Sequence, residues 1–249
     1  IPSLSGDMIT GMVLNLSFNK WLNEQFKNGA EIASLCVGSF LLASAGLLKG
    51  KSCATHWQYA HEFRSFFPDA KLVDDKIITE HNGIYSSGGA SSYWNLLLYL
   101  VEKYTDREIA IWASKYFALD IGRNNQSVFT MFRGQKDHED GDIIKAQEYI
   151  ETHYQDKLTV DRLAGKFNIV RRTFERRFKK ATSNTAVEYI QRVRVEAAKK
   201  YLETSRKTVS EVMYEVGYTD ANAFREVFRR ISGMSPIDYR NRYNKEVDA

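Results

Sequence analysis

The sequence predicts an α/β domain followed by an all-α domain that contains two similar helix-turn-helix units. Three observations carry this prediction. Short apolar segments alternate with helical patterns in residues 1–122, as in a sheet covered by helices. From Asp142 onward almost every segment has a helical pattern. This helical part also repeats itself at an offset of 49 to 50 residues.

Length and composition set the limits of the interpretation. A chain of 249 residues with 43% hydrophobic residues is enough for one or two domains with real cores. No apolar run approaches the ~20 residues of a membrane helix, and the residues after Ile1 show no signal-peptide pattern. Cys36 and Cys53 are too few for a disulfide framework. We therefore expect a cytoplasmic protein.

The net charge of +4 is unevenly distributed. Residues 142–249 contain 22 Lys and Arg against 16 Asp and Glu, a net charge of +6, whereas residues 1–141 carry −2. A basic part joined to a slightly acidic part indicates one module that binds nucleic acid and one with a different task.

The first domain is expected over residues 1–122. Parallel strands covered by helices on both faces would explain its pattern. A strand is predicted at 30–35, a turn at 36–38, a helix at 39–48, strands at 76–80 and 84–87, and a helix at 91–104. The polar segment 123–141 is predicted to be a linker, and residues 142–249 form the second domain.

The repeat in the second domain is visible in its aromatic positions. Phe174 and Phe178 in the first copy correspond to Phe224 and Phe228 in the second, and each pair has the four-residue spacing of one helix face. Each copy ends alike, the first at Tyr189 and the second at Tyr239. We place the two helix-turn-helix units at about 159–180 and 208–231, joined by a long helix over 187–204.

The second unit contains residues suited to a tight turn. Gly217 is expected to close its first helix in a left-handed conformation, and Asp220 or Thr219 to cap the next helix. Pro236 follows Ser235 as the first residue of a helix follows its cap. In the first unit Val170 occupies the capping position, so we expect Asn168 to cap that helix instead.

The motif Gly217-Tyr218-Thr219-Asp220, together with Gly233-Met234-Ser235-Pro236-Ile237-Asp238-Tyr239-Arg240, resembles the AraC/XylS-family signature over about residues 142–243. The resemblance implies a transcription regulator, by expectation an activator, that binds duplex DNA and contacts RNA polymerase. The second helix of each unit would enter a major groove. The outward residues that this register implies are Arg171, Arg172, Glu175, Arg176, Ala221, Asn222, Arg225 and Glu226.

These side chains suit base recognition. Arg can bind guanine through two hydrogen bonds and Asn can bind adenine. Glu can accept from cytosine, or it can orient a neighbouring Arg. A second group is expected to contact phosphates, which position the protein without specifying sequence: Arg192, Arg194, Lys199, Arg229 and Arg230.

Cys36 lies where a predicted strand turns into a helix. Such a turn exposes its apical side chain and lets helix N-terminal amides stabilise a thiolate. With Thr55-His56-Trp57 and Gly88-Gly89-Ala90, this pattern is similar to the ThiJ/PfpI branch of the class I glutamine-amidotransferase-like superfamily. More narrowly, Ala43-Ser44-Ala45-Gly46-Leu47-Leu48-Lys49-Gly50 and Thr55-His56-Trp57 resemble AraC-family regulators of the GlxA-like group. The resemblance implies a truncated doubly wound domain whose first strands would precede Ile1.

We interpret this domain as a sensor and not as an enzyme. Cys36 and His56 are vestigial catalytic candidates, and Asn95 stands where relatives often carry Asp. A cysteine hydrolase or amidotransferase-like enzyme, or a thiol redox sensor using Cys36 and Cys53, remains the alternative. No cofactor or metal is expected.

The resemblance also implies an unknown small-molecule effector, often a nitrogen-containing metabolite, and a homodimer. Five aromatic residues could bind a cationic effector or belong to the core: Trp57, Tyr59, Tyr85, Tyr93 and Trp94.

Overall fold

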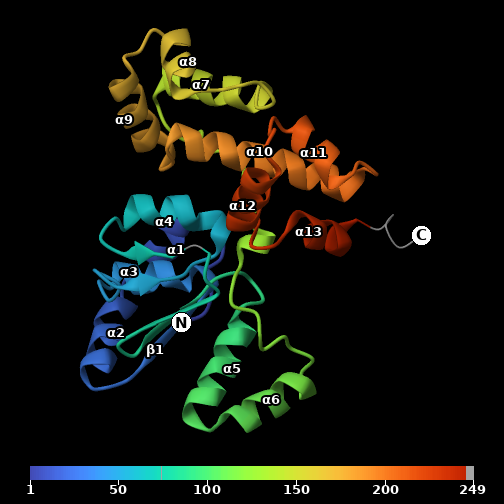
Figure 1. Cartoon of the computed structure of the whole chain (residues 1–249). Helices are drawn as coiled ribbons and strands as arrows, with labels where there is room; N and C mark the ends of the chain where they lie inside the picture. Colours follow the sequence, from blue (N-terminus) through green and yellow to red (C-terminus); the bar gives the residue numbers. More distant parts are fainter. Residues whose placement is uncertain (74, 245–249) are drawn as a thin grey trace. The chain divides into compact units, whose positions relative to one another are not determined.

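The computed structural model of the chain describes residues 1–73 and 75–244 (Figure 1). The chain divides into two compact units, one over Ile1–Ser127 and one that begins at Val128. Neither unit contains a helix long and apolar enough to cross a membrane within these described residues.

The first unit mixes short strands with helices. Its helices and strands are α1 Met8–Asn15, α2 Phe18–Lys27, β1 Ile32–Leu35, η1 Cys36–Gly38, α3 Ser39–Ser44, β2 Ser52–Cys53, η2 Trp57–Tyr59, α4 Ala60–Phe66, β3 Lys71–Leu72, β4 Ile78–His81, β5 Ile84–Ser87, α5 Tyr93–Tyr104 and α6 Arg107–Tyr116.

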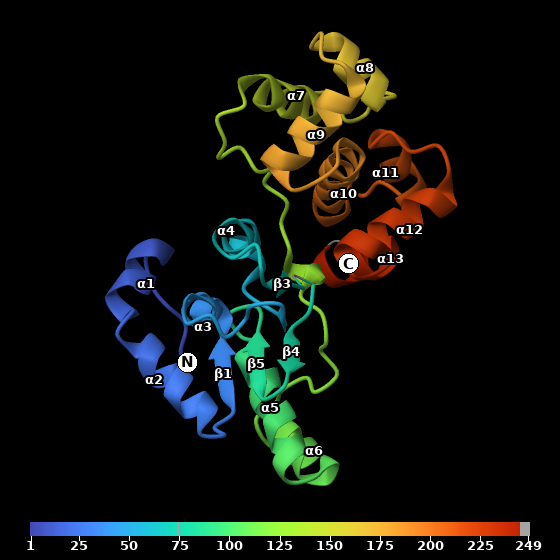
Figure 2. The ribbon, with the colours of Figure 1, turned by 90° about the vertical axis from the view of Figure 1, so that its left-hand side faces the viewer.

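The sheet has the strand order β1-β5-β4, and Figure 2 shows the three strands side by side. β1 pairs with β5 in parallel, but β4 pairs with β5 antiparallel. The prediction of an all-parallel sheet is therefore wrong. Asn82 and Gly83 both have positive φ, 50° and 75°, and a two-residue turn of this kind joins neighbouring strands as a hairpin.

Helix α3 is shorter than the sequence predicts. The expected helix over 39–48 ends at Ser44, because Gly46 adopts a left-handed φ of 77° and turns the chain. Leu47 and Leu48 follow the turn and remain buried. The apolar pattern thus continues past the helix end, so hydrophobicity alone did not show where the helix stops.

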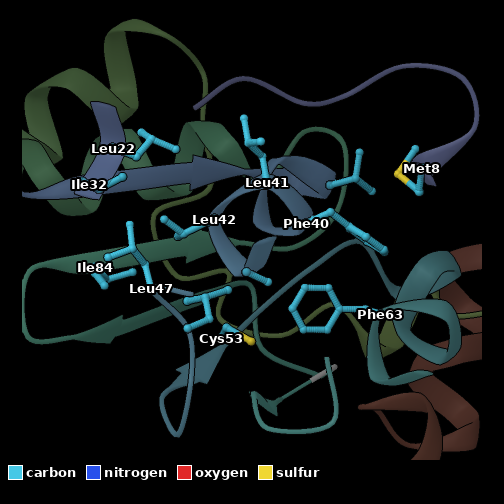
Figure 3. Packing of buried hydrophobic residues seen from close by; sticks show 13 residues of the cluster. Met8, Leu22, Ile32, Phe40, Leu41, Leu42, Leu47, Cys53, Phe63 and Ile84 are labelled. Carbon is cyan, nitrogen blue, oxygen red and sulfur yellow. The ribbon is translucent and has the colours of Figure 1, made fainter. Parts of the chain in front are cut away.

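The core of the first unit lies between β1, α3 and α4. Phe40 of α3 and Phe63 of α4 are fully buried and meet edge to face, with ring centroids 5.0 Å apart (Figure 3). All four residues of β5 are buried, as expected for a central strand covered on both faces. This core holds the end of β1, and therefore Cys36, in place.

The second unit is entirely helical in its described part apart from connecting segments. Its helices are α7 Gly141–Thr152, α8 Val160–Lys166, α9 Arg171–Thr182, α10 Ala186–Thr204, α11 Val209–Glu215, α12 Ala221–Ser232 and α13 Pro236–Tyr243. Two clusters of buried residues form its core, one around Phe174 and Phe178 and one around Phe224 and Phe228.

The segment predicted to be a linker makes hydrogen bonds with both units, its beginning with the first and its later part with the second. Gln126 belongs to the first unit, where its side-chain amide donates to the carbonyl of Thr55 over 3.0 Å. Gln135 belongs to the second unit, where its backbone carbonyl accepts from the Gln147 amide over 2.8 Å. Polar composition marks an exposed segment, but it does not reveal which unit binds its hydrogen-bonding groups.

Candidate nucleic-acid interface

The first helix-turn-helix is formed by α8 and α9. Thr159 caps α8, accepting from the backbone N–H of Arg162. The turn contains Asn168 at a φ of 53°, and α9 follows with Val170 at its N-cap and no side-chain capping bond. The expectation that Asn168 caps α9 is wrong. Asn168 instead provides the left-handed residue of the turn, a conformation that Asn tolerates better than most residues.

The second helix-turn-helix, formed by α11 and α12, has the turn that the sequence predicts. Gly217 has a φ of 80°, and a Cβ atom there would lie 2.5 Å from the carbonyl oxygen of Gln155. Asp220 caps α12 and accepts from the backbone N–H of Ala223 over 2.6 Å. Gly217 is thus required both by its conformation and by the close approach of the neighbouring backbone.

The two helix-turn-helix motifs are stabilised by equivalent tyrosine contacts. Tyr189 packs edge to face on Phe178 and donates to Glu151, while Tyr239 packs edge to face on Phe228 and donates to Glu203. Burial raises the pKa of both tyrosines, so both stay protonated donors. The repeated contacts hold α9 and α12 in equivalent positions within their motifs, and both helices lie beside α10 (Figure 1).

Helix α9 has a buried face and a basic exposed face. Phe174 and Phe178 are fully buried, whereas Arg171, Arg172, Glu175 and Arg176 are exposed. Arg171 is bound within the protein, 3.1 Å from Asp161 of α8 and 3.6 Å from Glu175. No hydrogen bond or ion pair engages Arg172 or Arg176 in the part of the chain that the structure describes.

Helix α12 repeats this division. Phe224 and Phe228 are buried, and the residues on the opposite face are exposed: Ala221, Asn222, Arg225, Glu226, Arg229 and Arg230. Arg230 donates to the side chain of Gln191 over 2.7 Å. Among the described residues, Asn222, Arg225, Glu226 and Arg229 have no side-chain partner. Their role in DNA contact stays a prediction.

Lys179 and Lys180 extend the basic face of α9 and were not singled out from the sequence. With Glu175, Arg176 and the first residues of α10 they line a hollow of about 380 Å³. The sequence signal for them is the pair of adjacent lysines in the last turn of α9. This signal does not identify a binding site, because cations are favoured at the C-terminus of a helix whether or not they bind a ligand.

Arg177 was also not assigned a role from the sequence. Its guanidinium donates to Asp140 and Asp142 at the start of α7, with distances of 2.5 to 2.9 Å. These hydrogen bonds lower the pKa of Asp140. Arg177 therefore fastens α9 to α7 and is not part of the exposed face.

Two predicted phosphate contacts need correction. Lys199 is 3% exposed, and its Nζ donates to the carbonyl of Thr130 over 2.7 Å. Arg194 donates to the carbonyls of Tyr154 and Asp156, both over 2.8 Å, and lies over the ring of Tyr218. Both side chains hold the second unit together. Spacing on a long helix did not show which of its faces would be covered.

Arg192 lies on the same helix and is half-buried, with its guanidinium 6.0 Å from the ring centre of Phe132. Its phosphate contact remains a prediction.

In the first unit, Cys36 adopts a φ of 55° directly after β1. Positive φ is uncommon for a residue with a Cβ atom, and it is the conformation expected at a strained strand-to-helix turn. The carbonyl of Cys36 accepts from Ser39 over 3.2 Å, and its N–H donates to the hydroxyl of Ser87 over 3.4 Å. The side chain is half-buried.

In the part of the chain that the structure describes, no base is hydrogen-bonded to the Cys36 thiol. No hydrogen bond joins Cys36 to His56, whose Nδ1 instead accepts from the backbone N–H of Gln58 over 3.2 Å. Burial lowers the pKa of His56. Cys53 is fully buried, and burial raises its pKa to about 12. Asn95 donates to the carbonyl of Asp120, which is a structural contact.

The five aromatic residues considered for a cationic effector fall into separate groups. Trp57 and Tyr59 both lie against His56, and Tyr93 lies against Trp94. Tyr59 packs in the core near Phe40, and Tyr85 is buried beside Tyr99. Trp94 stacks on Phe117 and lines a groove between α5 and α6, a groove that the other four do not line. Tyr85 is thus a core residue, whereas Trp94 is exposed and the other three are half-buried. Binding of a cationic effector by these residues stays a prediction.

Comparison with known proteins agrees with this geometry. Residues 163–242 match the helix-turn-helix domain family, and residues 7–103 match the DJ-1/PfpI family. The chain therefore combines a DJ-1/PfpI-like α/β domain with a helical helix-turn-helix domain.

The chain is similar to proteins that are named as transcriptional regulators. The chain is 26% identical to the HTH-type transcriptional regulator GbdR of Pseudomonas aeruginosa over 231 residues, which are 88% of this chain and 60% of GbdR. It is 39% identical to the bifunctional transcriptional activator/DNA repair enzyme AdaA of Bacillus subtilis over 93 residues, 37% of this chain and 44% of AdaA.

Among solved structures, the DNA-binding domain of AdpA, a global transcriptional factor in complex with a target DNA, is 34% identical with a TM-score of 0.40. The match covers 41% of this chain and 91% of that one. In its match to GbdR, the chain spans about three fifths of the length of that relative.

Proposed function

We propose that this chain is a sequence-specific transcription regulator that binds duplex DNA through α9 and α12. The observation that carries the proposal is the duplicated division of these helices. Each buries two phenylalanines and exposes arginines that have no partner within the described residues, Arg172 and Arg176 in one and Arg225 in the other. Such helices suit the major groove, where Arg recognises guanine. The match to the helix-turn-helix family supports this function.

Selection of bound sequences from a random DNA pool, performed with the full chain, tests the proposal. We expect enrichment of a motif with two separate conserved blocks. The double variant Arg172→Ala/Arg225→Ala should lose this enrichment, whereas Lys20→Ala, which removes one charge from α2, should keep it. Binding should weaken steeply with salt, because Lys and Arg displace counterions from DNA. Absence of any enriched motif would contradict the proposal.

We further propose that the first unit responds to a small metabolite and that the protein acts in the cytoplasm, where it contacts RNA polymerase as an activator. The support is the match of residues 7–103 to the DJ-1/PfpI family in a chain similar to named regulators. Operator affinity measured with a panel of amino acids and quaternary amines tests the response. If no compound changes the affinity, this part of the proposal fails while DNA binding stands.

Cysteine chemistry is the second candidate function, and the strained φ of Cys36 is the observation that favours it. Among the described residues no hydrogen bond joins Cys36 to His56, which favours a non-enzymatic role, because a cysteine nucleophile needs a base within hydrogen-bond reach. Amide and ester turnover by the purified chain, compared with Cys36→Ala, separates the two functions. Turnover that disappears in the variant would overturn the non-enzymatic assignment.

A further inference from the structure

Helix α6 is oriented against the usual rule for a surface helix. It buries its small residues, with Ala110 at 0% and Ala113 at 8% exposure, and exposes large apolar ones, with Trp112 at 62% and Tyr116 at 70%. A helix on a solvated surface normally shows its polar face to water. The helix itself is well formed, since Asp106 caps it through a 2.8 Å bond to the N–H of Ile109.

The exposed apolar residues of α6 form a regular stripe. Ile109, Trp112 and Tyr116 are spaced by three and four residues, the spacing of the contact seam between two helices in a coiled coil. The rings of Trp112 and Tyr116 stack with centroids 5.2 Å apart. Beside the stripe, α5 and α6 enclose an apolar groove of about 520 Å³, lined in part by Trp94, Leu97 and Phe117. An exposed apolar area of this kind marks an interaction site.

The charges on α6 indicate which partner fits. Glu108 and Lys115 are both exposed, and neither has an ion pair within the described residues. They are seven residues apart, so they occupy the same flank of the apolar stripe. When two identical helices pack antiparallel about a two-fold axis, equivalent flanks face each other. Glu108 of each copy then approaches Lys115 of the other, and both charges are paired.

We propose that α6 and the adjacent groove form the contact between two copies of this chain, with the two α6 helices packed antiparallel. A parallel pairing would leave the same two charges without opposite partners. A membrane surface fits less well, because interfacial helices carry an excess of basic residues beside their apolar face. This assignment goes beyond the proposed DNA binding, for which a single copy already contains both helix-turn-helix units.

Sedimentation equilibrium of the full chain tests the interface. We expect a dimer, and Trp112→Glu should raise its dissociation constant at least about thirtyfold, since aromatic residues at the centre of an interface contribute most to its affinity. Trp21→Glu is the matched control, because Trp21 of α2 is also an exposed tryptophan, at 54%. It should leave the dimer unchanged. A monomeric chain at every concentration, or equal effects of the two variants, would overturn the proposal.

Charge reversal tests the antiparallel register. Glu108→Lys and Lys115→Glu should each weaken the dimer by about threefold or more, because each creates two like-charged contacts. The double variant should restore wild-type association. Additive weakening in the double variant would rule out this pairing. Circular dichroism confirms folding of each variant, and binding to one operator site confirms that the DNA-binding unit is intact, so failure here is distinct from failure of DNA binding.

Discussion

Lys199 donates a hydrogen bond from its buried ammonium group to the backbone carbonyl of Thr130, over 2.7 Å. The bond ties the segment before α7 to the long helix α10. Phe132 reinforces it: its N–H donates to Glu196 over 3.1 Å, and its ring lies edge to face against Tyr189. The segment that precedes the helices is therefore part of the second unit.

We predict that residues 128–249 fold by themselves and that residues 142–249 are less stable by about 2 to 4 kcal/mol. The shorter fragment loses the ring of Phe132, the contacts of Gln135 and the Asp140 cap of α7, and it leaves Lys199 buried without its carbonyl partner. Urea denaturation of both fragments measures the difference. Equal free energies of unfolding would show that the segment does not support the helices.

Arg172→Ala and Arg176→Ala should each cost about 1 to 3 kcal/mol on the specific site, because each removes a potential contact to a base. The loss should concentrate at one or two base pairs, so that the variant tolerates substitutions there. Arg229→Ala should instead weaken all sequences alike and lower the salt slope by about one. A panel of point-mutated operators distinguishes these outcomes. Uniform weakening by both α9 variants would mean that these arginines contact the backbone.

Arg194→Ala should lower the free energy of unfolding by about 1 to 3 kcal/mol, because two backbone carbonyls lose their charged donor and Tyr218 loses its stacked guanidinium. The salt slope of DNA binding should not change. Arg192→Ala is the matched control on the same helix, since no side-chain hydrogen bond holds Arg192 among the described residues. The combination of unchanged stability and a reduced slope in Arg194→Ala would restore its assignment as a phosphate contact.

The second unit should lose stability in acid, in part through Asp140. Hydrogen bonds from Arg177 lower the pKa of Asp140 in the folded state. A lowered folded-state pKa gives stability that is present above the unfolded pKa of about 3.9 and is lost as the pH falls through the folded value. Unfolding of residues 128–249 measured between pH 7 and pH 2 should show this loss. Asp140→Asn should reduce the loss of stability in acid. The control Asp137→Asn, at an exposed position, should leave that loss unchanged.

The sequence by itself determined the class of both domains and the location of the two helix-turn-helix units. Local chemistry was enough there: paired phenylalanines four residues apart, Gly217 at the turn and Ser235-Pro236 at a helix start each favour one local structure. The exposed faces of α9 and α12 follow from the same periodicity, since residues next to buried positions on a helix must point away from the core.

The tertiary structure decided everything that depends on contacts between distant segments. The strands β4 and β5 form a hairpin and not a parallel pair, because pairing direction depends on the turn between them. Lys199 and Arg194 are structural because residues 130 and 154–156 pack over their side of α10, about 40 to 70 positions away in sequence. The outward apolar stripe of α6 was equally hidden, since a helical pattern shows that one face is apolar but not whether it faces the core or the solvent.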